Sequence, residues 1–325
     1  MVYKVATSEV IKDDNTAVFY DVIVGVHHDL APSYTFQGST SGYTSGGIIP
    51  PYTSVIDKFP FSSDANATDV GFLTQARSGA AGQSSDASGY TSGGDAAPFT
   101  NVIDKFPFSS DANATDVGDL TQVKNGSAGQ SSADNGYTSG GSSPAIINII
   151  EKFPFSVDAN ATDVGDLTQV RYYTSGQSSA DNGYTSGGLV PPYTNVIDKF
   201  PFSSDANATD VGDLTQARAF IPATGQSSAD NGYTTGGFAP PTVNTIDKFP
   251  FSSDANATDV GDLTQTRYSP AGQSSTTHGY SSGGATFPPT VARNTIDKFP
   301  FSTDTNATDV GDLTQARVYC VGQQV

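Results

Sequence analysis

Short apolar or alternating runs, each bounded by Gly, Pro, Asn or Asp, follow one another along the whole chain. None keeps helical spacing over the ten or so residues that a helix needs, and such short, bounded runs are typical of β-strands. In one representative stretch the pattern predicts four strands, at 174–179, 184–188, 196–200 and 209–214. An Asn-Gly pair before the second of these strands is a strong hairpin signal. The pattern therefore predicts an all-β protein.

The last three strands of this unit recur six times along the chain, and the GQSS motif of the first strand recurs five times. The third and fourth strands of the unit lie in the phrase VIDKFPFSSDANATDVGDLTQAR (Val196–Arg218), and near copies of this phrase occur in every unit. The period is marked by the first phenylalanine of the FPF element, at Phe59, Phe106, Phe153, Phe200, Phe249 and Phe299. Four antiparallel strands in a repeat of about 40–50 residues are the signature of a β-propeller blade.

Each unit also has a fixed order of short motifs. A glycine doublet, a strand such as NVIDKF and a closing segment such as DLTQAR follow one another from about Gly38 to Arg317. This order resembles the kelch repeat, in which a strand ending in Gly-Gly precedes an N-x-V-E-x-Y strand and an L-P-x-A-R segment. Kelch repeats usually carry a tryptophan in the last strand, and this chain has none. The blades are therefore expected either to be thinner or to pack through the pair of Phe200 and Phe202.

The number of blades depends on the two chain ends. We expect one propeller domain, 1–325, with N-terminal strands in 1–33, six tandem repeats in 34–317 and a closing strand in 318–325. The C-terminal VYCVGQQV matches the GQ of the GQSS that marks the first strand of the repeat. The two ends are expected to combine into a seventh, shared blade, which would remove open sheet edges. The alternatives are six blades with an N-terminal docking arm, or an open β-solenoid or fibre.

The chain is strongly acidic, with 33 acidic and 15 basic residues and a net charge of −18. This charge argues against nucleic-acid binding, which needs a basic surface, and against docking on anionic lipid. A single cysteine leaves no intrachain disulfide, and no apolar run fits a signal peptide or a membrane span. We therefore expect synthesis in a cytoplasm and no membrane insertion. Six repeated cations are expected to pair with aspartates between blades: Arg77, Lys124, Arg171, Arg218, Arg267 and Arg317.

Comparison of the repeats with one another separates constant from variable connections. The turns between the first and second strands and between the third and fourth strands hardly change, as in SSADNG and PFSSDANA. The other two sets of connections vary, and in a four-stranded meander they share one face. Exposed aromatic and apolar residues on loops of a rigid scaffold are typical of binding surfaces. The candidate partner-binding residues are Tyr52, Phe99, Ile146, Ile147, Tyr172, Tyr173, Tyr193, Phe220, Phe238, Tyr268, Phe287 and Tyr319.

Catalysis finds little support in this sequence. Uniform repeats argue against an active site, which needs asymmetry, and the three histidines do not lie near a repeated nucleophile. The DANATD turn offers Asp205, Asn207 and Asp210 as oxygen ligands for calcium, but it lacks the regular twelve-residue loop with its closing glutamate. We therefore expect no enzyme activity and no cofactor, with calcium only as a weak candidate.

The tandem motifs GQSS, GYTSGG and DVGDLT resemble repeats in virion structural proteins of marine tailed phages, in particular cyanophages. This resemblance implies a fibre, tail or capsid-decoration protein located in the virion and made in the host cytoplasm. It also implies a symmetric assembly with other virion proteins, and a host surface receptor or glycan as partner. The alternative is a cellular kelch-type interaction adaptor or a lectin-like carbohydrate-binding protein.

Overall fold

A computed structural model describes residues 6–11, 17–22, 37–220 and 225–325. Two compact units divide the chain, Met1–Tyr34 and Thr35–Val325. In the first unit, β1 (Ala6–Ile11) and β2 (Ala17–Val22) pair as an antiparallel hairpin. No helix that could cross a membrane occurs within the described ranges.

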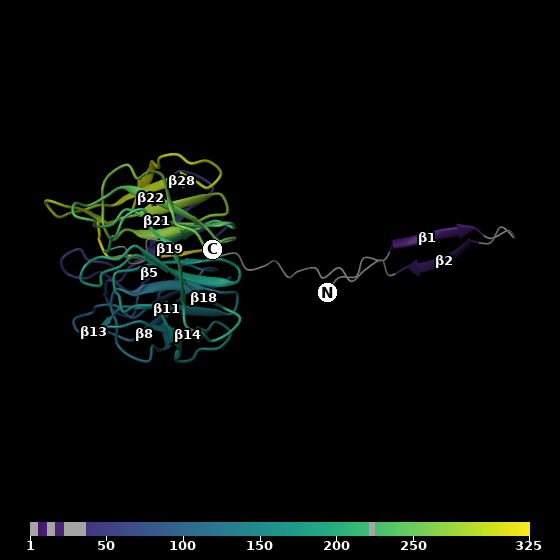
Figure 1. The fold of residues 1–325 in the computed structure, drawn as a ribbon, viewed down its shortest axis with the longest axis horizontal. Coiled ribbons are helices and arrows are strands. Elements are labelled where there is room, and N and C mark those ends of the chain that lie inside the picture. The colour runs from purple at the N-terminus through teal and green to yellow at the C-terminus, as the bar shows by residue number, and fades with distance from the viewer. Residues whose placement is uncertain (1–5, 12–16, 23–36, 221–224) are drawn as a thin grey trace. The chain divides into compact units, whose positions relative to one another are not determined.

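The second unit is a ring of six four-stranded antiparallel sheets, a β-propeller. Figure 1 shows that the sheets succeed one another in chain order, from the teal strands β8 and β11 to the yellow-green strand β28. The first strands of the blades contact one another in a closed circle around the axis. These first strands are β6 (Ala81–Ser84), β10 (Ala128–Ser131), β16 (Ser175–Ser178), β20 (Gly225–Ser227), β24 (Ala271–Ser274) and β30 (Val321–Gln324). The second strands are β3 (Ser41–Ser45), β7 (Ser88–Ser92), β11 (Asn135–Ser139), β17 (Asn182–Ser186), β21 (Asn231–Thr235) and β25 (His278–Ser282).

The outer half of each blade carries the invariant phrase. The third strands are β4 (Val55–Pro60), β8 (Val102–Pro107), β14 (Ile149–Pro154), β18 (Val196–Pro201), β22 (Thr245–Pro250) and β28 (Thr295–Pro300). The fourth strands are β5 (Thr68–Phe72), β9 (Thr115–Asp119), β15 (Thr162–Asp166), β19 (Thr209–Asp213), β23 (Thr258–Asp262) and β29 (Thr308–Asp312). Two connections contain short extra hairpins, β12 (Ser142–Ser143) with β13 (Ala145–Ile146), and β26 (Ala285–Thr286) with β27 (Val291–Ala292). The four-strand blade predicted from the sequence is confirmed.

The ring closes with six blades, so the expected seventh blade is wrong. The C-terminal strand β30 pairs with β3, giving a first blade ordered β30-β3-β4-β5. The repeat that begins at β3 lacks its own first strand, and the GQ of Gly322 and Gln323 fills that place. Blades 2 to 6 are β6-β7-β8-β9, β10-β11-β14-β15, β16-β17-β18-β19, β20-β21-β22-β23 and β24-β25-β28-β29. Closure therefore joins distant segments of the second unit alone, and it leaves no unpaired first strand.

Glycines let the first strands meet at the axis. A Cβ on Gly129 would overlap the carbonyl oxygen of Gly82 in the neighbouring blade, and a Cβ on Gly176 would overlap that of Gly129. Beside each glycine, a buried glutamine amide donates to the carbonyl oxygen of a tyrosine in the next blade, at 2.8–3.0 Å. These pairs are Gln83–Tyr137, Gln130–Tyr184, Gln177–Tyr233, Gln226–Tyr280, Gln273–Tyr43 and Gln323–Tyr90. The blades are therefore bonded in a complete circle.

Each interface between neighbouring blades has its own apolar core. Between blades 3 and 4, Tyr137 and Leu167 of one blade pack with Phe200 of the other, and Phe202 stacks on the Tyr137 ring at 4.9 Å between centroids. The other five interfaces repeat this arrangement with equivalent residues. The prediction that Phe200 and Phe202 take over blade packing in this tryptophan-free chain is confirmed.

A buried ion pair crosses every interface. In five of them an arginine after the fourth strand lies 2.8–3.2 Å from an aspartate on the third strand of the next blade, and both side chains are fully buried. The pairs are Arg77–Asp104, Arg171–Asp198, Arg218–Asp247, Arg267–Asp297 and Arg317–Asp57. The sixth is Lys124 with Glu151. The predicted structural role of these cations is confirmed, and losing one partner would leave a charge buried and unpaired.

Candidate functional site

The propeller has two faces of different character. The antiparallel order places the turns between first and second strands, and between third and fourth strands, on the constant face. The connections between second and third strands, and from each fourth strand to the next first strand, lie on the opposite, variable face. Apart from the six buried cations of the blade interfaces, only Asp95 and Arg293 are charged within these variable connections, although the chain carries a net charge of −18. The variable face is thus a nearly uncharged surface on an acidic protein.

The DANATD turns of the constant face hold neighbouring blades together. Asp205 bonds to Lys152 of the preceding blade at 2.5 Å, and Asn207 Oδ1 accepts from the backbone N–H of Asp166 at 3.0 Å. Asp210 Oδ1 accepts from the N–H of Gly212 at 3.1 Å. The three oxygen ligands proposed for calcium therefore each have a separate partner. No group of three or more metal-ligating His, Cys, Asp or Glu residues occurs in the part of the chain that the structure describes.

Six residues with left-handed backbone surround the axis on the variable face, one in each connection from a fourth to a first strand. Their φ angles lie between 52° and 71°. They are Gly79, Gly126, Tyr173, Phe220, Ser269 and Tyr319. Backbone hydrogen bonds link them across blades: Gly79 donates to Tyr319, Gly126 to Gly79, Tyr173 to Gly126, Ser269 to Phe220 and Tyr319 to Ser269, at 2.6–3.1 Å.

Four of these six axial positions carry a side chain despite the left-handed backbone. For residues other than glycine this conformation costs about 1–2 kcal/mol each. Two neighbouring blades avoid the cost with Gly79 and Gly126, so the backbone alone does not require a side chain here. Tyr173, Phe220 and Tyr319 therefore place aromatic rings beside the axis at an energetic cost, which is typical of functional positions.

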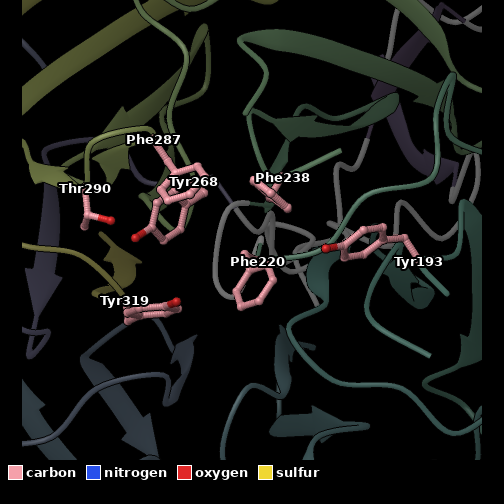
Figure 2. A pocket seen from close by; sticks show the side chains of 7 residues that line it. All are labelled: Tyr193, Phe220, Phe238, Tyr268, Phe287, Thr290 and Tyr319. Atoms are coloured by element: carbon pink, nitrogen blue, oxygen red, sulfur yellow. The ribbon is translucent and has the colours of Figure 1, made fainter. Parts of the chain in front are cut away.

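An aromatic hollow of about 300 Å³ opens beside this ring of residues. We call it the axial hollow; it is lined by Tyr193, Phe220, Phe238, Tyr268, Phe287, Thr290 and Tyr319. Figure 2 shows these side chains around the hollow; they lie in connections that follow strands of blades 4, 5 and 6, and Phe287 and Thr290 share one connection. Phe220 and Tyr319 come from the left-handed axial positions, and Phe287 is 46% exposed.

Neighbouring rings of the axial hollow meet edge to face. Phe238 lies 6.1 Å from Phe220, and Phe220 lies 6.2 Å from Tyr268, with interplanar angles of 87° and 76°. Tyr193 and Phe287 flank Phe238 at 6.0 Å and 5.8 Å, again nearly perpendicular. Such edge-to-face pairs are favourable beyond simple burial, so the rings support one another. Because neighbouring rings are nearly perpendicular, their faces point in several directions.

The polar groups of the axial hollow are all hydroxyls. Tyr193, Tyr268, Tyr319 and Thr290 supply them, and no charged side chain occurs among the described residues that line the hollow. Burial raises the pKa of the Tyr319 hydroxyl, and the nearby tyrosines add to that effect. Tyr319 therefore remains a protonated hydrogen-bond donor at neutral pH. The rings and hydroxyls of this lining can pack against a ligand and exchange hydrogen bonds with it.

Six of the twelve predicted residues come together in the axial hollow: Tyr193, Phe220, Phe238, Tyr268, Phe287 and Tyr319. Two more extend the cluster, since Tyr173 stacks on Phe220 at 4.7 Å and Tyr172 lies 4.5 Å from Tyr173. Thr290 was missed because the prediction selected aromatic and apolar residues. Its signal was its place in ATFPPTVARN, the longest connection between a second and a third strand.

The other four predicted residues lie on the variable face outside the axial hollow. Tyr52 Oη donates to Asp95 of the next blade at 2.8 Å, so its hydroxyl is engaged within the protein. Phe99, Ile146 and Ile147 are partly exposed on the corresponding connections of blades 2 and 3. All twelve candidate residues lie in variable connections, as the repeat pattern indicated, but the sequence did not show which blades would share a hollow.

The comparisons with known proteins assign no family to this chain. No protein-family model matches the sequence, and no curated protein matches it significantly. The architecture follows from the structure itself, because the strand order of each sheet and the closure of the ring are both observed. The chain is a six-bladed β-propeller built from tandem repeats and closed by its own C-terminal strand.

Proposed function

We propose that this chain is a non-enzymatic binding protein that receives its partner on the variable face. The observation that carries the proposal is the contrast between faces. Nearly all departures from the repeat lie in the variable connections, and there they build one asymmetric aromatic hollow from a nearly six-fold scaffold. A purely structural ring needs no such asymmetry. Aromatic residues presented by connections on a rigid scaffold are the usual composition of binding sites.

We further propose that the protein is a virion component of a tailed phage, as a fibre, tail or capsid-decoration protein. The support is the resemblance of its tandem phrases to repeats of marine phage virion proteins. The kelch-like order of the glycine doublet, the VIDKF strand and the closing arginine supports descent from kelch-type repeats. In this proposal the constant face and the hairpin β1–β2 serve assembly, and the variable face meets a host receptor or another partner.

The proposal is tested by locating the protein and then by mapping its contact surface. Antibodies against the chain are used to follow it through gradient purification of particles from its source. We expect it to sediment with particles in a fixed copy number, whereas an exclusively free, soluble protein would contradict the virion assignment. Purified protein is then tested for binding to host cells with Phe287→Ala in the hollow and Ala87→Ser on the constant face. Binding must fall for Phe287→Ala and remain for Ala87→Ser; equal binding would contradict the role of the face.

A cellular interaction adaptor or a lectin-like protein is the second candidate. The same variable face supports it, because the geometry of the hollow does not depend on whether the chain is attached to a particle. Recovery of the chain from uninfected cells in complex with a cellular partner would favour this candidate.

A further inference from the structure

We infer that the axial hollow binds an uncharged sugar ring at the end of a glycan. This inference rests on the proposed binding function, and it specifies the ligand of that same site. It follows from three properties of the hollow, namely its size, its lack of charge and its combination of ring faces with hydroxyls.

The size of the hollow selects a small group. A volume of about 300 Å³ lies at the lower end of ligand-binding sites in proteins. It admits one ring-sized group with its substituents rather than the side of a folded partner. Two residues with left-handed backbone, Phe220 and Tyr319, border the hollow (Figure 2), and all of its lining residues belong to variable connections. A ligand that ends in such a group, as a glycan chain does, can enter it end-on.

The absence of charge excludes ionic ligands as the preferred class. Burying an ion is costly unless a partner of opposite charge accompanies it. An anionic sugar would need a cation, but neither Arg293 nor any of the six buried interface cations is among the described residues that line the hollow. A quaternary ammonium group would attract the aromatic faces. It would have no carboxylate among the lining residues, since Asp95 lies in blade 2 and already accepts the hydroxyl of Tyr52.

The lining matches the amphipathic character of a neutral sugar. Its C–H faces are apolar and can pack on aromatic rings, while its hydroxyls need donors and acceptors at the rim. The hollow offers rings turned in several directions, with interplanar angles from 66° to 87°, and four hydroxyls from Tyr193, Tyr268, Tyr319 and Thr290. A fully apolar ligand would leave these hydroxyls without new partners, at a cost for each one that becomes buried.

The test uses the full chain and three sets of probes. One is a panel of neutral oligosaccharides, the second a panel of sialylated and sulfated glycans, and the third tetramethylammonium chloride. We expect saturable binding of at least one neutral oligosaccharide. Phe287→Ala should weaken it by about tenfold or more, and Tyr268→Phe, which removes only a hydroxyl, by about threefold to tenfold. Val157→Ala, which shortens an exposed apolar side chain in a turn of the constant face in blade 3, is the control and should leave binding unchanged.

Each remaining outcome overturns the inference. Binding only of charged glycans or of tetramethylammonium would assign another ligand class to the hollow. The absence of any glycan binding, or neutral-glycan binding that Phe287→Ala does not affect, would show that the hollow is not a sugar site. The proposed binding function is tested separately by the host-cell assay. If Phe287→Ala abolishes cell binding while no neutral glycan binds, the binding function stands and the sugar inference fails.

Discussion

Glycine at the axis is the residue on which the closed ring most depends. The first strands approach so closely that the place of one glycine's Cβ is already taken by the next blade's carbonyl oxygen. The GQSS motif was recognised from the sequence as a marker of the repeat. Its physical reason could not be predicted, because a glycine in a strand is equally compatible with a bulge or a turn. Only the ring geometry explains why this glycine recurs.

Substituting an axial glycine is expected to destabilise the propeller. In Gly129→Ala the added methyl would overlap Gly82, and neither strand can move away because each is enclosed by neighbours on both sides. Overpacking of this kind costs about 1–3 kcal/mol or more. We expect a lower midpoint of chemical unfolding than in wild type, measured by circular dichroism. Ala87→Ser, in an exposed turn of the neighbouring blade 2, is the control, and equal midpoints for the two variants would contradict the close approach.

The tyrosines between blades predict a limit of stability at high pH. Burial raises the pKa of Tyr184, Tyr233 and Tyr280 to about 12, from an ordinary value of 10.0. The folded state thus favours the protonated phenol, so this contribution to stability is complete below pH 10 and is lost as the pH rises toward 12. We expect the free energy of unfolding to fall across that range, measured by urea unfolding at successive pH values. A free energy of unfolding that stays constant between pH 10 and pH 12 would contradict the burial of these rings.

At the scale of elements, the interfaces between blades show which structural features can be predicted from repeated sequence motifs. The four strands, the turns and the pairing of the repeated cations were predictable, because each signal occurs several times in one chain. The sixth interface differs, since Lys124 and Glu151 replace arginine and aspartate together. The shorter cation is matched by the longer carboxylate, and Glu151 also accepts from the backbone N–H of Thr121 at 2.6 Å. The exchange is therefore one coupled change of a pair.

This coupling is measurable in a double-mutant cycle. Lys124→Arg should crowd the interface, and Glu151→Asp should leave Lys124 without a close partner. Loss of a buried partner typically costs about 3–5 kcal/mol. The double variant recreates the Arg–Asp pair of the other five interfaces, so we expect a favourable coupling energy of about 1–3 kcal/mol from urea unfolding. Additive effects of the two substitutions would contradict the coupling.

The variable connections mark the limit of prediction at this scale. Alternation and turn residues assign the connections to one face, which placed all twelve candidate residues there. They do not specify backbone conformation within a connection. Tyr173, Phe220 and Tyr319 have a left-handed backbone that their residue types disfavour. The local sequence therefore did not predict this conformation. The axial hollow therefore became visible only when blades 4, 5 and 6 were placed side by side.

At the scale of the whole molecule, closure decided the number of blades. The sequence showed that 318–325 resembles a first strand, but it did not show which second strand would accept it. The repeat beginning at β3 lacks a first strand of its own, and pairing there gives Gln323 its bond to the carbonyl of Tyr90 in blade 2. A seventh blade would have required the N-terminal strands to supply the partner. They form the separate hairpin β1–β2 in the other unit.

Truncation at either end of the chain distinguishes closure of the ring by the C-terminal strand β30 from closure by the N-terminal strands. Deleting 321–325 removes the first strand of blade 1 and exposes the edge of β3, so we expect a loss of more than about 4 kcal/mol and a tendency to aggregate. Deleting 1–34 should leave the unfolding midpoint of the propeller unchanged, because the ring closes within Thr35–Val325. Calorimetry of both truncated proteins provides the measurement. Greater damage from the N-terminal deletion would contradict closure by β30.

The glycine contacts at the axis also bear on how such a gene can change. Recombination between near-identical repeats readily adds or removes one copy. In this ring the six first strands already touch through their backbones, so five could not surround the axis without compression and seven would open a channel through it. We therefore expect selection to hold the copy number at six. Connections on the variable face carry no such constraint, and gene conversion could exchange them between blades, producing new hollows on an unchanged ring.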